Sequence, residues 1–129
     1  GRVEAVGTYH DSCHLSKSMR VGREPREILQ AIPGVIFKEM SKPDACCGSG
    51  GSYGLTHIGT SAEIGKRKAA DAASTGASTV TTGCPACMMQ LLDSMHRFGS
   101  TQRVRHYISL LADAYRAERE SEQTNVAAI

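Results

Sequence analysis

The sequence predicts an α/β domain, a three-layer parallel sheet of about four strands with helices on both faces. Short runs of β-forming residues alternate with helical segments, and the predicted order is βαβαβαβα. The cysteines follow the predicted strands and precede the next helical segments, as ligand-binding loops do in such folds. A length of 129 residues is enough for one domain with its own core.

The first third of the chain predicts two strands and one helix. Residues 3–10 are rich in β-formers and predict the first strand, whereas residues 15–23 are polar and irregular. Pro25 suits the first position of a helix, and Gly34 marks its end. The apolar run 35–40 is bounded by turn residues and predicts the second strand.

The middle of the chain predicts two further helices around a third strand. Thr60 and Glu63 have the spacing of a capping box, which predicts a helix from Ser61 to about Ser74. The β-branched run 79–82 predicts the third strand. Pro85 then suits the first position of the next helix.

The last part of the chain predicts a weaker strand, a helix and a tail. Residues 102–107 form the strand, and the helix carries an apolar stripe of Ile108, Leu111, Ala112 and Tyr115. We expect residues 1–116 to form a single domain and residues 117–129 to be a polar, flexible tail. Because the chain starts at Gly1, with a strand signal close behind it, we expect a fragment of a longer protein.

Composition excludes several classes of function. The net charge is only +2, from 15 basic and 13 acidic residues that are scattered along the chain. With no tryptophan and two phenylalanines, the sequence offers no stacking platform, so we expect no nucleic-acid partner. It has no apolar run long enough to cross a bilayer and no signal-peptide pattern, which predicts a cytoplasmic domain.

Five cysteines are many for a small cytoplasmic domain, and their odd number argues against a secreted disulfide framework. Cys13, the pair Cys46 and Cys47, and the pair Cys84 and Cys87 follow three different predicted strands. Because the carboxyl ends of parallel strands share one edge of the sheet, we expect these thiols to gather there. The pattern indicates metal, iron–sulfur or thiol chemistry.

The residues around these cysteines fit such a site. Cys84 and Cys87 form a C-x-x-C at a helix start, where free N–H groups and the helix dipole favour thiolates. The glycines that follow the double cysteine allow a bend and close approach of a cofactor to the main chain. These cofactor-binding candidates are Gly48, Gly50 and Gly51.

Two histidines flank Cys13. His10 and His14 are candidates for hydrogen-bonding a cofactor or carrying protons, and ordinary loop hydrogen bonds are an equal alternative. No residue is a candidate for catalysis in its own right. We therefore expect a domain that is not catalytic alone.

Taken together, these motifs resemble a known family. They are the run His10–His14, Glu24–Arg26, the double cysteine with its glycine, and the run Gly83–Leu91. They resemble the cysteine-rich CCG domain of heterodisulfide reductase and of the iron–sulfur subunits of glycolate and lactate oxidases and anaerobic glycerol-3-phosphate dehydrogenase. The chain departs from the family in Ser12, where proline is usual.

The resemblance implies a [4Fe-4S] cluster, which is non-cubane in heterodisulfide reductase, held by Cys13, Cys46, Cys47, Cys84 and Cys87. It implies one domain of a longer iron–sulfur subunit that passes electrons from a flavin-containing dehydrogenase to a quinone or another redox protein. A parent complex on the inner face of the cell membrane would fit this role. The last motif is most similar to the glycolate and lactate oxidase branch.

Two other functions use the same residues. Four of the five thiols could hold zinc in a structural or interaction module, although one cysteine would be left over. Cys84 with Cys87, or Cys46 with Cys47, could instead act as a thiol–disulfide pair. Such a pair requires neither Cys13 nor five clustered cysteines.

Overall fold

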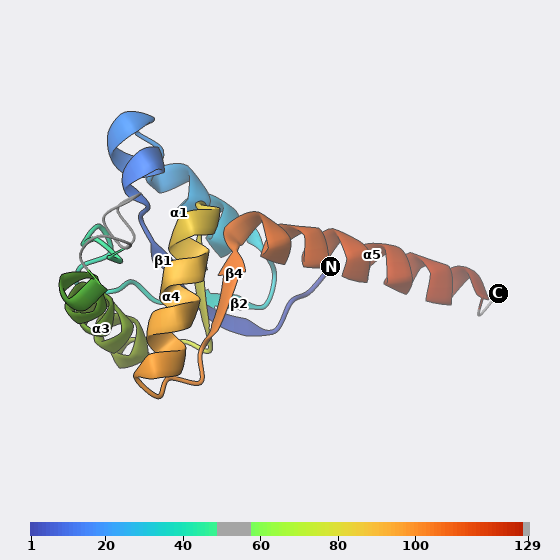
Figure 1. Cartoon of the computed structure of the whole chain (residues 1–129). Helices are drawn as coiled ribbons and strands as arrows, with labels where there is room; N and C mark the ends of the chain where they lie inside the picture. Colours follow the sequence, from blue (N-terminus) through green and yellow to red (C-terminus); the bar gives the residue numbers. More distant parts are fainter. Residues whose placement is uncertain (49–57, 128–129) are drawn as a thin grey trace.

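The computed structural model, which describes residues 1–48 and 58–127, confirms the α/β fold (Figure 1). One parallel sheet has the strand order β2-β1-β3-β4. Its strands are β1 (Ala5–His10), β2 (Val35–Phe37), β3 (Thr79–Thr82) and β4 (Arg103–His106). The helices are α1 (Arg23–Ala31), α3 (Ile58–Ser74), α4 (Pro85–Arg97) and α5 (Tyr107–Ala127), with a short π-helix, η1 (His14–Ser18), after β1.

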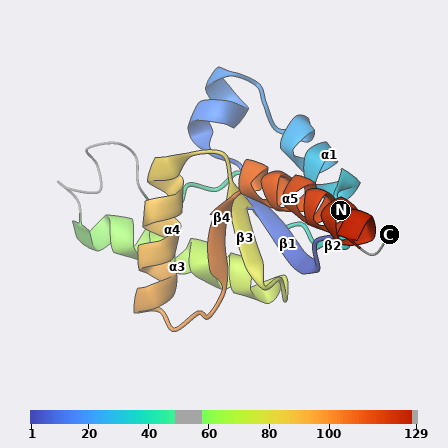
Figure 2. The same ribbon diagram turned by 90° about the vertical axis from the view of Figure 1, so that its right-hand side faces the viewer.

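The sheet lies between two helical layers, each with its own apolar core. Figure 2 shows α3 and α4 on one face and α1 and α5 on the other. Val80 of β3 packs with α3 and α4, in a cluster that also contains Cys47 and Cys87. Tyr9 of β1 packs with α1 and α5. The predicted three layers are therefore present, and two of the cysteines belong to the α3/α4 core.

The strand order places a ligand-binding crevice at one point of the sheet. The chain passes from β1 to β2 at one side and then crosses to β3 at the other side of β1. In open parallel sheets, ligands bind outside the carboxyl ends of the strands where the order reverses in this way. Here that point lies between His10, the last residue of β1, and Thr82, its partner at the end of β3.

Two predicted boundaries in the first third are wrong. α1 begins at Arg23, so Pro25 is the third residue of the helix. The N–H that proline lacks is not needed there, because the first N–H groups of a helix have no helical partner. β2 ends at Phe37 rather than at residue 40. The chain leaves the sheet there because Met40, 3% exposed, turns into the α3/α4 core.

The predicted capping box at the start of α3 does not form. The helix begins at Ile58, so Thr60 and Glu63 both lie inside it. Ser61 instead turns its hydroxyl toward the double-cysteine loop and donates to the Gly48 carbonyl oxygen at 2.6 Å. This bond ties α3 to the loop rather than closing the helix on itself.

α5 packs with a face that shares only Leu111 with the predicted stripe, and Leu111 is half-buried against the Tyr9 core. Leu110 and Ala114 are buried, whereas Ile108 and Tyr115 are 41% and 61% exposed. The helix starts directly after β4, and the Tyr107 ring packs edge-on against Tyr9 with ring centroids 5.9 Å apart. That contact fixes the rotation of the helix, which the apolar pattern alone could not reveal.

The polar segment from residue 117 is helical up to Ala127 in the structure, and its flexibility stays a prediction. In the part of the chain that the structure describes, no helix combines the length and the apolar character needed to cross a membrane.

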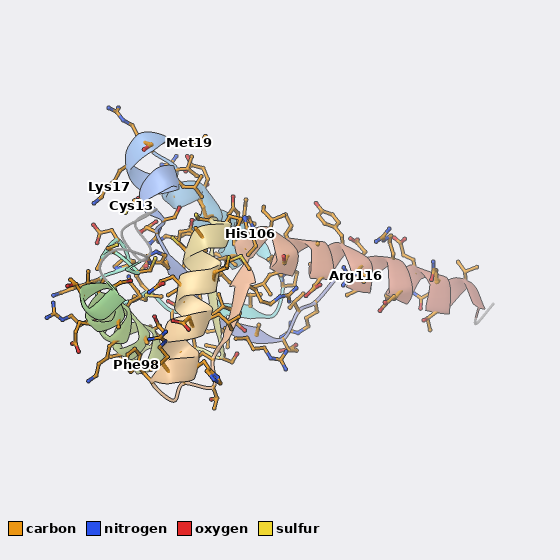
Figure 3. The ribbon with its side chains drawn as sticks, viewed as in Figure 1. Cys13, Lys17, Met19, Phe98, His106 and Arg116 are labelled. Atoms are coloured by element: carbon orange, nitrogen blue, oxygen red, sulfur yellow. The ribbon has the colours of Figure 1, made fainter. Side chains whose placement is uncertain are left out.

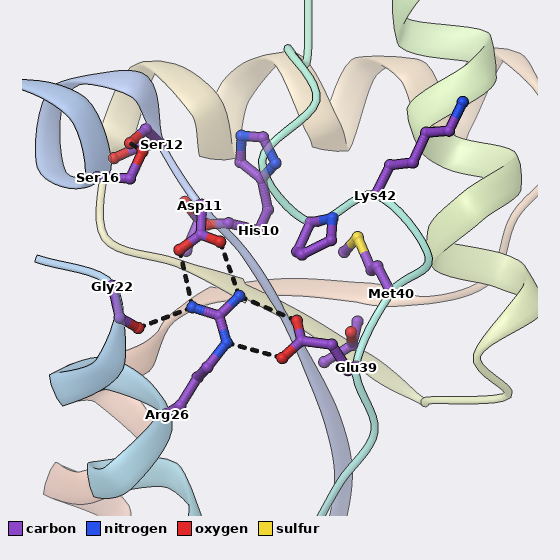
Figure 4. A network of polar contacts seen from close by, with 12 residues as sticks. His10, Asp11, Ser12, Ser16, Gly22, Arg26, Glu39, Met40 and Lys42 are labelled. Carbon is purple, nitrogen blue, oxygen red and sulfur yellow. Dashed lines mark hydrogen bonds and ion pairs between the residues drawn. The ribbon is translucent and has the colours of Figure 1, made fainter.

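One partly buried guanidinium joins three segments near the cysteines (Figure 4). Arg26 of α1 donates to both carboxylate oxygens of Asp11, at 2.8 and 2.7 Å, and to both of Glu39, at 2.7 and 2.9 Å. Its side chain is 19% exposed and that of Asp11 is 10% exposed. The Asp11 N–H donates in turn to the Pro43 carbonyl oxygen at 2.9 Å. The loop after β1 is therefore fixed to the segment that leads to Cys46 and Cys47.

Arg26→Met should lower the free energy of unfolding by about 2–3 kcal/mol, because Asp11 stays buried without its ionic partner. Arg23→Met is a matched control on the same helix. It removes an exposed pair with Glu27 and should cost less than about 0.5 kcal/mol. Urea unfolding followed by circular dichroism measures both, and equal losses would contradict this account of the network.

Candidate metal centre

Two thiols from distant segments meet inside the α3/α4 layer. Cys47 and Cys87 are 3% and 8% exposed, and their Sγ atoms lie 3.5 Å apart. This is a contact between thiols, because a disulfide would require about 2.05 Å. Cys84 packs against the same core. The structure thus brings together one thiol of the double cysteine and both thiols of the C-x-x-C.

The C-x-x-C has the predicted helix-start geometry. Cys84 is the N-cap of α4 with an extended backbone, and Pro85 occupies the first helical position. Cys87 follows as the third helical residue and points toward the sheet, on the buried face that continues with Leu91. The local sequence therefore fixes where both thiols stand relative to the helix start.

Gly48 allows the double cysteine to lie close to α3. Its φ is +97°, a conformation that side chains disfavour, and a Cβ added here would lie 2.6 Å from the Ser61 carbonyl oxygen. The space a side chain would occupy at Gly48 is thus filled by α3. This packing explains the glycine without a ligand, and its part in cofactor binding stays a prediction.

His10 is the third member of the buried group. One ring nitrogen of His10 and the Sγ atoms of Cys47 and Cys87 all lie within 4.8 Å of one another. The side chain is 1% exposed, and Nδ1 has no hydrogen-bond partner among the described residues. A buried polar atom without a partner is costly, and a bound group within hydrogen-bonding distance of Nδ1 would relieve that cost.

The electrostatics of the group correct the prediction that the start of α4 favours a thiolate at Cys87. A hydrogen bond with Cys47 and then burial raise the pKa of Cys87 well above its ordinary range, and the neighbouring Cys84 raises it further. Desolvation and neighbouring thiols therefore override the helix dipole, which alone would favour a thiolate. A cation bound among these thiols would reverse the balance, because metal-coordinating thiols are deprotonated.

The other two cysteines lie outside this buried group. Cys13 is exposed. It directly precedes η1 and the residues after it, the segment that carries Lys17 and Met19 (Figure 3). Cys46 is exposed too, and its Sγ accepts a hydrogen bond from the Gly48 N–H at 3.3 Å. Cys46 also borders a groove of about 490 Å³ between its loop and α3. The gathering of all five thiols at one position stays a prediction.

Three other candidates lie outside what the structure describes. They are Gly50, Gly51 and the side chain of His14.

Ser12, where the family usually has proline, forms hydrogen bonds in the turn after β1. Its hydroxyl accepts a hydrogen bond from the Leu15 N–H at 3.3 Å, and its carbonyl accepts from both the N–H and the hydroxyl of Ser16. Ser12 therefore organises the turn that carries Cys13.

Sequence reasoning missed two residues of α3 that hold the double-cysteine loop. Lys68 is 2% exposed and donates to the Lys42 carbonyl oxygen at 2.8 Å. Asp71 accepts from the N–H groups of Ser41 and Lys42, both at 2.9 Å. A signal for Lys68 was present in the sequence. It lies on the helical stripe of Ser61, Gly65, Ala69 and Ala72, whose small residues indicate a buried face.

Comparison with known proteins identifies the class of domain. Residues 7–92 match the model of the CCG family, described as a cysteine-rich domain. The match runs from within β1 to within α4, and so includes both His10 and Cys87 of the buried group. The chain belongs to this CCG cysteine-rich domain family.

Curated relatives of the chain are much longer proteins. It is 40% identical to a probable glycolate oxidase iron–sulfur subunit of Bacillus subtilis, over 84% of this chain and 25% of the relative. It is 39% identical to a fumarate reductase (CoM/CoB) subunit of Methanothermobacter marburgensis, over 84% of this chain and 22% of the relative. It is 36% identical to a dihydromethanophenazine:CoB–CoM heterodisulfide reductase subunit of Methanosarcina barkeri, over 83% of this chain and 27% of the relative. The chain thus spans about a quarter of their length.

The burial of the thiols predicts their order of reaction with iodoacetamide in the metal-free, reduced protein. Cys13 and Cys46 should be alkylated first, because they are exposed. Cys47 and Cys87 should react slowly at neutral pH, because both are buried and Cys87 is held as a thiol. Peptide mass spectrometry over time measures each rate. Alkylation of Cys87 as fast as that of Cys13 would contradict the buried group.

Proposed function

We propose that this chain is an iron–sulfur electron-transfer domain of a larger oxidoreductase complex. The observation that carries the proposal is the buried contact of Cys47 and Cys87 with a ring nitrogen of the buried His10 within 4.8 Å of both sulfurs. Thiols are the ligands that iron–sulfur clusters take, and a buried site protects a cluster from solvent. The relatives support this proposal, because they include a glycolate oxidase subunit that is itself named as iron–sulfur.

We propose that all five cysteines hold a [4Fe-4S] cluster. Cys47, Cys84 and Cys87 would form the buried part of the ligand set, and Cys13 and Cys46 would complete it. A bound cluster would supply one-electron transfer, without a catalytic residue in this domain. His10 would hydrogen-bond the cluster or its ligands from the end of β1, a contact of the kind that tunes reduction potential.

The parent complex is proposed from the relatives and the family resemblance. A 2-hydroxy-acid oxidase with glycolate or lactate as substrate fits the first relative, and a heterodisulfide-reductase-like complex fits another. The domain would then receive electrons from a flavin-containing dehydrogenase subunit. It would pass them to a quinone or another redox protein, in the cytoplasm or at the inner face of the membrane.

A zinc site is the second candidate, and one specific observation favours it. His10, Cys47 and Cys87 place one nitrogen and two sulfurs within 4.8 Å of one another, and Cys84 lies in the same core. One nitrogen and three sulfurs are a common tetrahedral ligand set for structural zinc. This set would leave Cys13 and Cys46 without a role in metal binding.

Anaerobic reconstitution separates the two candidates. The reduced protein should take up iron and sulfide in a fixed ratio and gain visible absorption, because thiolate ligands bind iron–sulfur clusters. Elemental analysis, sulfide assay and absorption spectra measure the product, and a parallel incubation with zinc alone is the control. Stoichiometric zinc binding with no uptake of iron and sulfide would overturn the iron–sulfur proposal.

Two substitutions distinguish the ligand sets. Cys87→Ser should abolish binding of either metal, because Cys87 belongs to both sets. Cys13→Ser should lose most of the bound iron and sulfide if five cysteines hold a cluster, but it should keep zinc in a site made by the buried group. Metal content per protein after gel filtration measures both. Full iron and sulfide content in Cys13→Ser would exclude Cys13 as a ligand.

A further inference from the structure

Lys68 is a buried lysine, and among the described residues its hydrogen bonds go to the segment before the double cysteine. Its Nζ donates to the carbonyl oxygens of Lys42 at 2.8 Å and Pro43 at 3.4 Å, and it lies 4.0 Å from the Met40 sulfur. Among the described residues, no carboxylate forms an ion pair with it. A buried ammonium without an ion pair is costly, so a residue such as methionine would be the simpler choice for packing.

Asp71, one turn further along α3, completes a clamp on the same segment. Its two carboxylate oxygens accept the N–H groups of Ser41 and Lys42, while Lys68 donates to the carbonyl groups that follow. The backbone of residues 41–43 is thus held through donors and acceptors by one face of α3. This clamp ends a few residues before Cys46 and Cys47, so it fixes the course of the chain into the site.

The ammonium also lies within electrostatic range of the thiols. Burial lowers the pKa of Lys68, while the charges of Asp71, Cys47, Asp44 and Asp11 act to raise it. The geometry places the ammonium beside the same core as the thiols, because its Nζ lies 4.0 Å from the Met40 sulfur and Met40 packs in the cluster that contains Cys47 and Cys87. In a region of low dielectric constant, a positive charge at the edge of this core would stabilise negative charge on its thiols.

We propose that Lys68 is a positioning residue for the metal centre, which holds Cys47 against Cys87 and supplies positive charge beside the thiolates of a bound cluster. The second half of this proposal rests on the proposed iron–sulfur function. Reduction adds negative charge to a cluster, so a buried cation nearby favours the reduced state. Loss of Lys68 should therefore lower the reduction potential, and loss of the Asp71 charge should raise it.

The test compares Lys68→Met and Asp71→Asn with the native chain and with Lys66→Met. Lys66 is exposed on the same helix, and its substitution removes the same charge without touching the clamp. Each protein is reconstituted with iron and sulfide, and its midpoint potential is measured by spectroelectrochemical titration. We expect a lower potential in Lys68→Met, a higher one in Asp71→Asn and little change in Lys66→Met. A loosened loop alone would not shift the two clamp variants in opposite directions, so shifts of the same sign would overturn the electrostatic role.

A metal-free measurement tests the positioning role independently. Alkylation of Cys47 should accelerate in Lys68→Met and remain at the native rate in Lys66→Met, because only the first variant releases residues 41–43. Should Lys68→Met fail to fold, Asp71→Asn carries the same measurement, since one oxygen acceptor is lost to an amide. Unchanged Cys47 reactivity in folded clamp variants would overturn the positioning role. If the native chain takes up no iron and sulfide, the proposed function is refuted. The comparison of Cys47 alkylation rates in the metal-free proteins still decides the positioning role.

Discussion

The contact between Cys47 and Cys87 is the constraint on which the rest of the structure depends. Two thiols from distant segments are held 3.5 Å apart within an apolar core. The hydrogen bond with Cys47 and burial favour the protonated form of Cys87, so this ligand becomes anionic only when a cation offsets the cost. In the proposed function, these thiols would be preorganised ligands whose deprotonation is coupled to metal binding. A ring nitrogen of the buried His10 lies within 4.8 Å of both sulfurs.

Two charged networks, each at least partly buried, hold the segments that carry the proposed ligands. Arg26 fixes the loop after β1 through Asp11, and Lys68 fixes the segment before the double cysteine. The two networks meet at Pro43, whose carbonyl oxygen accepts from the Asp11 N–H and from Lys68. Buried charges rarely add much net stability, because desolvation opposes their attraction. Their contribution here is the fixed position of two loops that have little regular secondary structure to hold them.

Patterns within one segment predicted the fold well, whereas patterns that depend on neighbours did not. The run 79–82 and the Cys84–Pro85 helix start are as the sequence indicates, because β-branching and proline act locally. The face of α5 was mispredicted because Tyr107 packs against Tyr9, a residue almost a hundred positions away. The start of α3 was mispredicted because Ser61 bonds to Gly48 rather than within its own helix.

The sequence by itself determined the order of strands and helices and the placement of every cysteine after a strand. It determined the family as well, because the family's motifs are local runs of residues. Only the tertiary structure decided which thiols are buried together, since that depends on where the double-cysteine loop lies against α3 and α4. It also decided that Lys68 faces the loop and not solvent. A lysine is placed by the segment that covers it, and that segment lies 25 to 28 positions away in the chain.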